Sequence, residues 1–196
     1  MIPFLTRAYI AGGRLAEGFA RRKLRERMAR GKEDPERFEE RFGHASVPRP
    51  EGPLVWFHAA SVGESVSLLE LIRRLVSVLP GHHILVTTGT VTSAAIMSSR
   101  LPEGTLHQYA PIDIDPAVSR FLDHWRPDIA IRTESEFWPC LFARLADRQI
   151  PTLLINARLS DRSVARWRWA PQVARAMVRI FDMILAQDEQ TARHLY

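Results

Sequence analysis

Cysteine and long apolar runs are the two scarce features of this 196-residue chain. Its single cysteine, Cys140, excludes an intramolecular disulfide and any zinc site built on paired cysteines, and it favours a reducing compartment. No uninterrupted apolar stretch approaches the roughly 20 residues that a membrane-spanning helix needs. The N-terminal residues lack the charge order and the small-residue cleavage site of a signal peptide, so we expect neither feature.

Several familiar motifs are also missing from the sequence. It contains no G-x-G-x-x-G after the first predicted strand and no G-x-x-x-x-G-K-[ST], which excludes a dinucleotide fingerprint and a P-loop. It has no G-x-S-x-G elbow of an α/β-hydrolase. The histidines have no metal-ligand spacing, so we predict no metal site and interpret them as structural or surface residues.

What the chain does have is the composition of a soluble globular domain. Hydrophobic residues make up 46% and charged residues 25% of the sequence, enough for one core of ordinary size. The net charge of +5 and the pI of about 10.1 favour an anionic partner. Nucleic acid, an anionic membrane face and a phosphorylated ligand all fit that charge.

Residues 1–49 are predicted to form a basic amphipathic, membrane-proximal segment followed by a linker. Between Arg14 and Lys32, basic residues far outnumber acidic ones. An apolar stripe at helical spacing runs through the same stretch: Leu15, Phe19, Leu24 and Met28. Such a helix either lies on an anionic membrane surface or packs its stripe on the domain, and the sequence favours neither alternative. The proline-rich segment 47–53 then leads to the first strand.

From residue 50 onward, β-favouring apolar runs alternate with helical periodicity. We predict strands over 54–57, 83–88, 105–110, 128–132, 152–155 and 183–186. Helices are predicted between them, including one over 163–181, and Asp188 begins a last one. This alternation predicts an α/β fold with a doubly wound parallel sheet.

Glu64 is the residue on which two interpretations compete. Ser61 and Glu64 have the S-x-x-E spacing of a capping box at the start of a helix. Alternatively, Glu64 is a general base at the mouth of a cleft, because the tight turn at Gly63 lies at the carboxyl end of a strand, where open α/β sheets bind ligands. Spacing alone favours the cap, and the two roles are compatible.

Polar side chains also follow the other predicted strands, and parallel strands bring the loops after them to one edge. The expected edge residues are Ser61, Gly63, Glu64, Thr88, Gly89, Thr90, Asp113, Glu134, Glu136, Asn156, Arg158 and Ser160. Helix N-termini and an arginine at such an edge suit a phosphate or a carboxylate. Each residue also has a structural alternative: Thr90 as a helix cap, Asp113 in an Asx turn, and Arg158 as an ion-pair partner of Glu134 or Glu136. Nothing in the chain resembles a nucleic-acid-binding fold, so nucleic acid is not an expected partner.

Five of these stretches resemble one family. Their order and spacing are similar to those of Kdo (3-deoxy-D-manno-octulosonic acid) transferase: Phe57-His-Ala-Ala-Ser-Val-Gly-Glu64, Thr87-Thr-Gly-Thr-Val-Thr92, Pro111-Ile-Asp113, Glu134-Ser-Glu-Phe-Trp-Pro139 and Asn156-Ala-Arg-Leu-Ser160. The resemblance covers about residues 50–196. One departure is Cys140, where the family usually has asparagine after Trp-Pro.

The resemblance implies a Rossmann-like N-terminal, acceptor-binding domain of a GT-B glycosyltransferase of lipopolysaccharide biosynthesis. Such an enzyme transfers Kdo with inversion from CMP-Kdo to a lipid A precursor, needs no metal or cofactor, and works at the cytoplasmic face of the inner membrane. The family's proposed catalytic base falls on Glu64, and a second important glutamate falls on Glu134 or Glu136. The donor-binding C-terminal domain is expected to be absent from this chain.

Two alternatives stay open at this point. One is another GT-B glycosyltransferase acting on a lipid-linked acceptor with a different sugar nucleotide. The other is a non-enzymatic module that binds anionic lipid.

Overall fold

The computed structural model describes residues 9, 10, 12, 13, 16–133, 138–158, 175, 176 and 178–195. The helices and strands in this part of the chain are α2 (Glu17–Met28), the 3₁₀ helix η1 (Phe38–Phe42), β1 (Leu54–Ala59), α3 (Val62–Val78), β2 (His83–Thr88), α4 (Val91–Arg100), β3 (Leu106–Tyr109), α5 (Asp115–Trp125), β4 (Ile129–Thr133), α6 (Pro139–Asp147), β5 (Thr152–Ala157), β6 (Met183–Ala186) and α9 (Glu189–Leu195). Most of the helix predicted over 163–181 lies outside the described residues.

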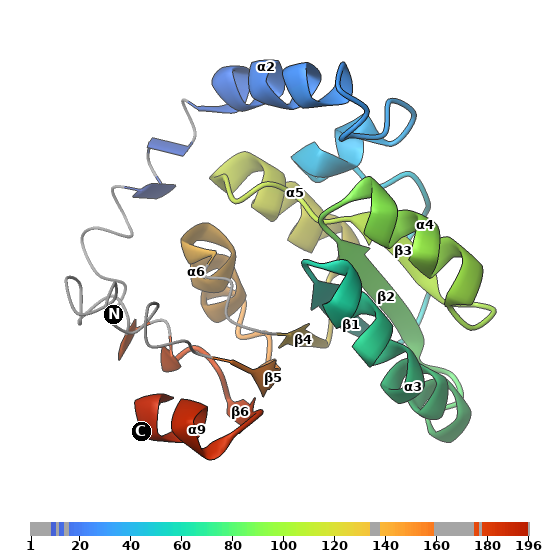
Figure 1. Cartoon of the computed structure of the whole chain (residues 1–196), viewed down its shortest axis with the longest axis vertical. Coiled ribbons are helices and arrows are strands. Elements are labelled where there is room, and N and C mark those ends of the chain that lie inside the picture. Colours follow the sequence, from blue (N-terminus) through green and yellow to red (C-terminus); the bar gives the residue numbers. More distant parts are fainter. Residues whose placement is uncertain are drawn as a thin grey trace.

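The six strands form one sheet in the order β3-β2-β1-β4-β5-β6, and every pairing is parallel. Figure 1 shows α3 and α4 on one side of this sheet and α5 and α6 on the other. The strand order runs outward in both directions from the central pair β1 and β4, and the right-handed crossovers that parallel strands favour then place helices on both faces. The predicted α/β, Rossmann-like doubly wound fold is therefore confirmed.

The strand predictions were correct in position, and two of them were too short. β2 and β6 have the predicted bounds. β1 continues past Phe57 to Ala59, because His58 and Ala59 stay in register with Thr87 and Thr88 of β2. β5 continues past Ile155 to Ala157, with an irregularity in its pairing to β6 between Leu154 and Ala157. These extensions come from pairing with neighbouring strands, which local apolar patterns do not encode.

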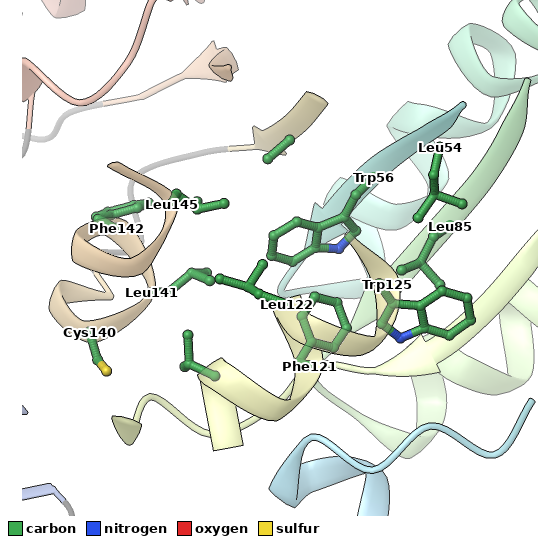
Figure 2. Close-up of a cluster of buried hydrophobic side chains, with 12 residues drawn as sticks. Leu54, Trp56, Leu85, Phe121, Leu122, Trp125, Cys140, Leu141, Phe142 and Leu145 are labelled. Atoms are coloured by element: carbon green, nitrogen blue, oxygen red, sulfur yellow. The ribbon is translucent and has the colours of Figure 1, made fainter. Parts of the chain in front are cut away.

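Two apolar clusters hold the layers together, one on each face of the sheet. On the face of α3 and α4, Phe57 and Val86 pack against Leu68, Ile72 and other helix residues. On the opposite face, strand residues meet α5 and α6, as Figure 2 shows. There the ring of Trp56 lies 4.8 Å from that of Phe121, and both side chains are buried. The strands therefore have apolar residues on both faces, as central parallel strands require.

A row of four buried polar side chains crosses the face covered by α5 and α6, one from each of four neighbouring strands. We call it the polar row: Gln108 of β3, Thr87 of β2, His58 of β1 and Arg132 of β4. Within it, the Thr87 hydroxyl accepts a hydrogen bond from the indole N–H of Trp56 at 2.9 Å. The side-chain oxygen of Gln108 accepts one from the indole of Trp125 at 2.6 Å. Part of the row therefore satisfies the two buried tryptophans.

The apolar stripe predicted along the N-terminal helix is divided between the domain and solvent. Leu24 is buried and Met28 is partly buried against Phe38 and Phe42 of η1. Phe19 is 60% exposed, and Leu15 lies outside the described residues. The packing alternative is thus confirmed for the second half of the stripe. None of the described helices combines the length and apolar character that crossing a bilayer requires.

The segment between α2 and β1 is tied to the edge strand β3 by buried carboxylates. Glu40 accepts a hydrogen bond from the backbone N–H of Tyr109 at 2.7 Å and pairs with Arg37 at 2.9 Å. Glu33 lies between Arg27 and Arg41, at 2.7 Å and 3.4 Å. An edge strand has backbone groups without a strand partner, and Glu40 satisfies one of them. Residues 33–46 are therefore packed onto the Rossmann-like domain.

Candidate active site

The candidate site lies where the carboxyl ends of β1 and β4 meet. These strands are neighbours in the sheet, but the chain leaves β1 towards α3 on one face and the next helix after β4 is α6 on the other. Such a switch point opens a crevice beyond the strand ends, where ligands of open α/β sheets bind. Glu64 follows β1 here, and the acidic motif 134–136 directly follows β4.

Glu64 forms the predicted capping box at the start of α3. The Ser61 hydroxyl accepts a hydrogen bond from the backbone N–H of Glu64 at 3.3 Å, and Glu64 Oε1 accepts one from the N–H of Ser61 at 3.1 Å. The helix consequently begins at Val62, four residues before the first apolar position of its periodic pattern. This reciprocal bonding fixes the orientation of the carboxylate.

The other oxygen of Glu64 reaches across to β4. Oε2 accepts hydrogen bonds from the backbone N–H of Ala60 at 3.0 Å and from the hydroxyl of Thr133 at 2.6 Å. Among the described residues, Oε1 accepts only the bond from Ser61, and a carboxylate oxygen has room for two. The side chain is 5% exposed. Glu64 is therefore held rigidly, with acceptor capacity remaining on Oε1.

The loops after β1 and β2 approach each other closely at Gly89. A Cβ on Gly89 would lie 3.3 Å from the carbonyl oxygen of Ala60, so a side chain there would press on the loop that leads to Glu64. A Cβ on Gly63 would meet only the Ser61 hydroxyl, at 4.0 Å. Ser61 and Gly63 thus lie beside Glu64, and Gly89 lies against the loop that leads to it. A role of these residues in substrate binding stays a prediction.

The two threonines predicted beside Gly89 have structural partners. Thr90 is the N-cap of α4, and its hydroxyl accepts a hydrogen bond from the N–H of Ser93 at 3.1 Å. Thr88 is fully buried in β2, where its hydroxyl lies 2.9 Å from Nε2 of His107. Their predicted role in substrate binding stays a prediction, and capping is confirmed for Thr90.

Asp113 reaches α6 rather than its own turn. Its Oδ1 accepts a hydrogen bond from the N–H of Leu141 at 2.9 Å and its Oδ2 accepts one from Cys140 at 3.2 Å. Burial raises the pKa of this carboxyl, and the bonds from the two amides oppose that rise. The Asp113 side chain thus caps a helix distant in sequence.

The remaining predicted residues lie on β5, directly after it, or outside the described residues. Asn156 belongs to β5 and has a φ of 53°, the left-handed conformation that asparagine tolerates better than most residues. Arg158 is exposed and directly follows this strand. The pKa of the Asp188 carboxyl is lowered, mainly by hydrogen bonds from Thr191 and to a smaller extent by the charge of Arg158. Glu134, Glu136 and Ser160 lie outside the described residues.

Two buried side chains near the start of α6, those of Arg132 and His58, were not among the predicted site residues. Arg132, 1% exposed, lies with its guanidinium 4.8 Å from the ring of Trp138 and 5.2 Å from that of Phe142. His58 packs edge-on against Trp138 at 4.8 Å, and its Nε2 makes no hydrogen bond to any described residue. Burial, then the charges of Arg132 and Arg41, hold the pKa of His58 well below its usual value, so the ring is neutral. The signal in the sequence that could have indicated Arg132 as a functional residue is its position directly after the apolar run 129–131 of a predicted strand.

Acceptor oxygens suited to a metal ion are not gathered at this edge in the described part of the chain. Within those residues, no three His, Cys, Asp or Glu side chains lie together in a way that could hold a metal ion. The chemistry that the described geometry offers is that of a fixed carboxylate at the carboxyl end of the sheet, with a buried arginine near the end of β4.

The fold and this arrangement define a Rossmann-like α/β domain whose functional edge is the switch point between β1 and β4. The particular family follows from comparison with known proteins: a family model described as 3-deoxy-D-manno-octulosonic-acid transferase (kdotransferase) matches residues 36–196. The chain belongs to this family, which confirms the resemblance seen in its motifs.

Individual relatives support the same assignment. The chain is 44% identical over 144 residues to a probable mitochondrial 3-deoxy-D-manno-octulosonic acid transferase of Arabidopsis thaliana, which covers 74% of this chain and 32% of the relative. It is 38% identical over 164 residues to the transferase of Rickettsia bellii, covering 84% and 39%. With the Haemophilus influenzae transferase it shares 35% over 147 residues, covering 75% and 34%. The chain thus spans about a third of the length of these relatives.

Proposed function

We propose that this chain forms the acceptor-binding half of an inverting glycosyltransferase that moves Kdo from CMP-Kdo to a phosphorylated lipid A precursor in lipopolysaccharide biosynthesis. Membership of the family supports Kdo transfer. The observation that carries the assignment to this half is Glu64, oriented by three hydrogen bonds at the switch point and able to accept one more on Oε1.

The reaction assigns that oxygen a defined task. Oε1 of Glu64 takes the proton of the acceptor hydroxyl as its oxygen attacks the anomeric carbon of Kdo. The bond from that carbon to the phosphate oxygen breaks, and CMP leaves as a phosphate monoester. Direct displacement inverts the anomeric centre, by the geometric logic that separates inverting from retaining glycosidases. No metal or cofactor takes part in this scheme.

The other half of the enzyme would hold the donor. The matched relatives are about three times as long as the segment that this chain covers. We assign the CMP-Kdo site to a second domain facing the switch point, since that edge is where the Rossmann-like domain presents Ser61 and Glu64.

The basic N-terminal helix suits the location that this reaction requires. Arg22 and Lys23 on α2 are 70% and 53% exposed, Arg25 and Arg30 are also exposed, and Phe19 projects beside them. Exposed cations with an aromatic side chain favour an anionic bilayer surface and a phosphorylated lipid. We propose that the protein works at the cytoplasmic face of the inner membrane, bound peripherally.

The test is an assay of Kdo transfer with a polypeptide that contains this chain and is as long as the matched relatives. Incubated with a lipid A precursor, it should transfer Kdo from CMP-Kdo and should not use UDP-sugars. Transfer from a UDP-sugar alone would make it a different glycosyltransferase. Binding to anionic vesicles without any transfer would make it a lipid-binding module.

A further inference from the structure

Thr133, the last residue of β4, lies on the face of the sheet that α3 covers. Side chains alternate along a strand, so Thr133 shares the face of Ile131, which packs in the apolar cluster beneath α3 and α4, and not the face of Arg132. The neighbouring strand β1 places His58 opposite Arg132. Thr133 is therefore one position beyond this pair, next to the loop in which β1 leads to Glu64.

The hydroxyl of Thr133 has two acceptors within reach. Its oxygen lies 2.6 Å from Oε2 of Glu64 and 3.2 Å from the carbonyl oxygen of His58. A hydroxyl has one proton to donate, and the nearer, charged oxygen attracts it more strongly. Thr133 is buried, so bulk water competes little for this bond. The hydroxyl therefore donates mainly to the carboxylate and has a second acceptor in reserve.

The other two hydrogen bonds to the Glu64 carboxylate come from the backbone. Ala60 donates its N–H to Oε2 at 3.0 Å and Ser61 donates its N–H to Oε1 at 3.1 Å. When Oε1 takes a proton, the negative charge of the carboxylate is lost and the attraction on the Thr133 hydroxyl falls. Its proton can then turn to the carbonyl oxygen of His58 while every heavy atom stays in place. Within the described residues, Thr133 is the one side chain that donates to this carboxylate.

Titratable side chains are few on the elements around this bond, in the part of the chain that the structure describes. Glu70 is the next one along α3, Arg100 is the one that α4 carries, and β5 has none before Arg158 follows it. On β1 and β4 they are His58 and Arg132, which belong to the polar row on the opposite face. Hydrogen bonds from uncharged donors therefore hold the candidate base.

We propose that Thr133 is a positioning residue for Glu64: its hydroxyl holds Oε2 while the carboxylate is ionised, leaves Oε1 to take the proton of the acceptor hydroxyl, and then turns to the carbonyl oxygen of His58. Thr133 itself does not touch the acceptor. The inference rests on the proposed function, in which Oε1 is the base. Burial disfavours a charged carboxylate, so loss of this donor makes Glu64 available as a base only at higher pH.

Kinetics of Thr133→Val and Thr133→Ser, in a polypeptide that contains this chain and is as long as the matched relatives, test the proposal. Valine keeps the shape of threonine without its hydroxyl, so the acid limb of the kcat profile should move up by about one pH unit, with little change in the acceptor KM. Serine keeps the hydroxyl and should restore the parent profile. A kcat that falls equally at every pH, or a raised KM with unchanged kcat, would overturn the proposal.

Thr152→Val is the matched control. Thr152 is also buried, and its hydroxyl donates a hydrogen bond to the carbonyl oxygen of Ile150 at 2.9 Å, at the amino end of β5. Glu64 lies at the carboxyl ends of the parallel strands, which form the other edge of the sheet. The control removes the same kind of buried hydroxyl and should leave the pH profile unchanged. An equal shift in Thr152→Val would indicate a general loosening of the domain and overturn the proposal.

Hydrogen exchange on the 196-residue chain separates this proposal from the proposed function. The amides of Ala60 and Ser61 donate to Glu64, so their exchange reports how firmly the carboxylate is held. Thr133→Val should speed it by at least about tenfold, whereas Thr133→Ser and Thr152→Val should not. Unchanged exchange in Thr133→Val would overturn the positioning role. If exchange rises but the unsubstituted full-length polypeptide transfers no Kdo, the proposed function fails and the hold of Thr133 on Glu64 stands.

Discussion

The hydroxyl of Thr133, the last residue of β4, donates a 2.6 Å hydrogen bond to the carboxylate of Glu64, which follows β1. This bond crosses the switch point of the sheet and joins the two loops that diverge there. It links the candidate base to the residue directly before the acidic motif. The candidate base is therefore tied to the end of β4 as well as to its own loop.

Replacing Glu64 by glutamine should abolish transfer and leave the domain folded. Glutamine also satisfies the S-x-x-[EQ] capping box, so α3 keeps its cap, but an amide takes no proton from the acceptor hydroxyl. We expect a loss of at least about 100-fold in kcat in a domain that still folds, with a lowered thermal stability because the amide nitrogen replaces one of the two oxygens that accept backbone N–H bonds. Glu70→Gln, the same change at an exposed position of α3, is the control. Normal turnover by Glu64→Gln would rule out the base.

Thr133→Val should show how strongly β4 supports Glu64. Valine has the shape of threonine without the hydroxyl, so Oε2 loses its shortest bond inside a buried site. Bonds to charged groups stabilise proteins by about 1.5–3 kcal/mol, and we expect a destabilisation of that order in denaturant unfolding. A double-mutant cycle with Glu64→Gln should give a coupling energy above about 0.5 kcal/mol. Additive effects would mean that the bond carries no support.

The stability of the domain should depend on pH through His107. Burial, followed by the charge of Arg37, lowers the pKa of this ring from 6.5 to about 4. The folded state therefore binds fewer protons than the unfolded state between these values, so stability is complete above pH 6.5 and is lost as the pH falls towards 4. The loss amounts to roughly 2 to 3 kcal/mol.

Thermal unfolding of the parent chain and of His107→Gln between pH 4 and 7 measures this contribution. Glutamine does not titrate, so the variant should show a flatter stability profile over that range. Parallel profiles for the two proteins would show that His107 does not titrate differently on folding.

The exposed arginines on α2 and in the turn after it should control binding to anionic vesicles. Arg25 and Arg30 are exposed, and reversing both with Arg25→Glu and Arg30→Glu should weaken binding of the chain to phosphatidylglycerol vesicles by at least about tenfold, since each basic residue near such a surface contributes about 1 kcal/mol. Binding should also fall as salt is raised.

Co-sedimentation measures the effect, and Arg73→Glu with Arg74→Glu is the matched control. These exposed arginines lie on α3, so the net charge changes equally while α2 stays basic. If both double variants lose the same affinity, net charge rather than α2 determines binding.

The elements that sequence predicted well are those whose signal is local. β2 and β6 are β-favouring apolar runs with the predicted bounds, and the capping box of Ser61 and Glu64 is written in a four-residue spacing. β1 and β5 were predicted too short because their last residues join the sheet through pairing with neighbouring strands, β2 and β6 respectively. Parallel pairing depends on residues that are distant in the chain, so a prediction from short stretches of sequence cannot include them.

The same distinction applies to the site. The position of Ser61, Gly63 and Glu64 could be predicted because loops that follow parallel strands lie at the carboxyl edge of the sheet. The partners of Glu64 and Asp113 did not: Thr133 is 69 positions from Glu64, and Leu141 is 28 from Asp113. Thr133 was assigned to the loop, whereas it ends β4. Contacts across the chain decide what a carboxylate does, and they appear only once the strands are aligned.

The polar row has a consequence for how related proteins diverge. The indoles of Trp56 and Trp125 each depend on one neighbour, Thr87 or Gln108, for their N–H. A descendant that exchanged Gln108 for leucine would leave an indole N–H stranded in the core, and one that exchanged Trp125 for phenylalanine would leave an amide without its donor. Substitutions at these positions should therefore be inherited as pairs, so that each tryptophan and its acceptor persist or disappear together across the lineage.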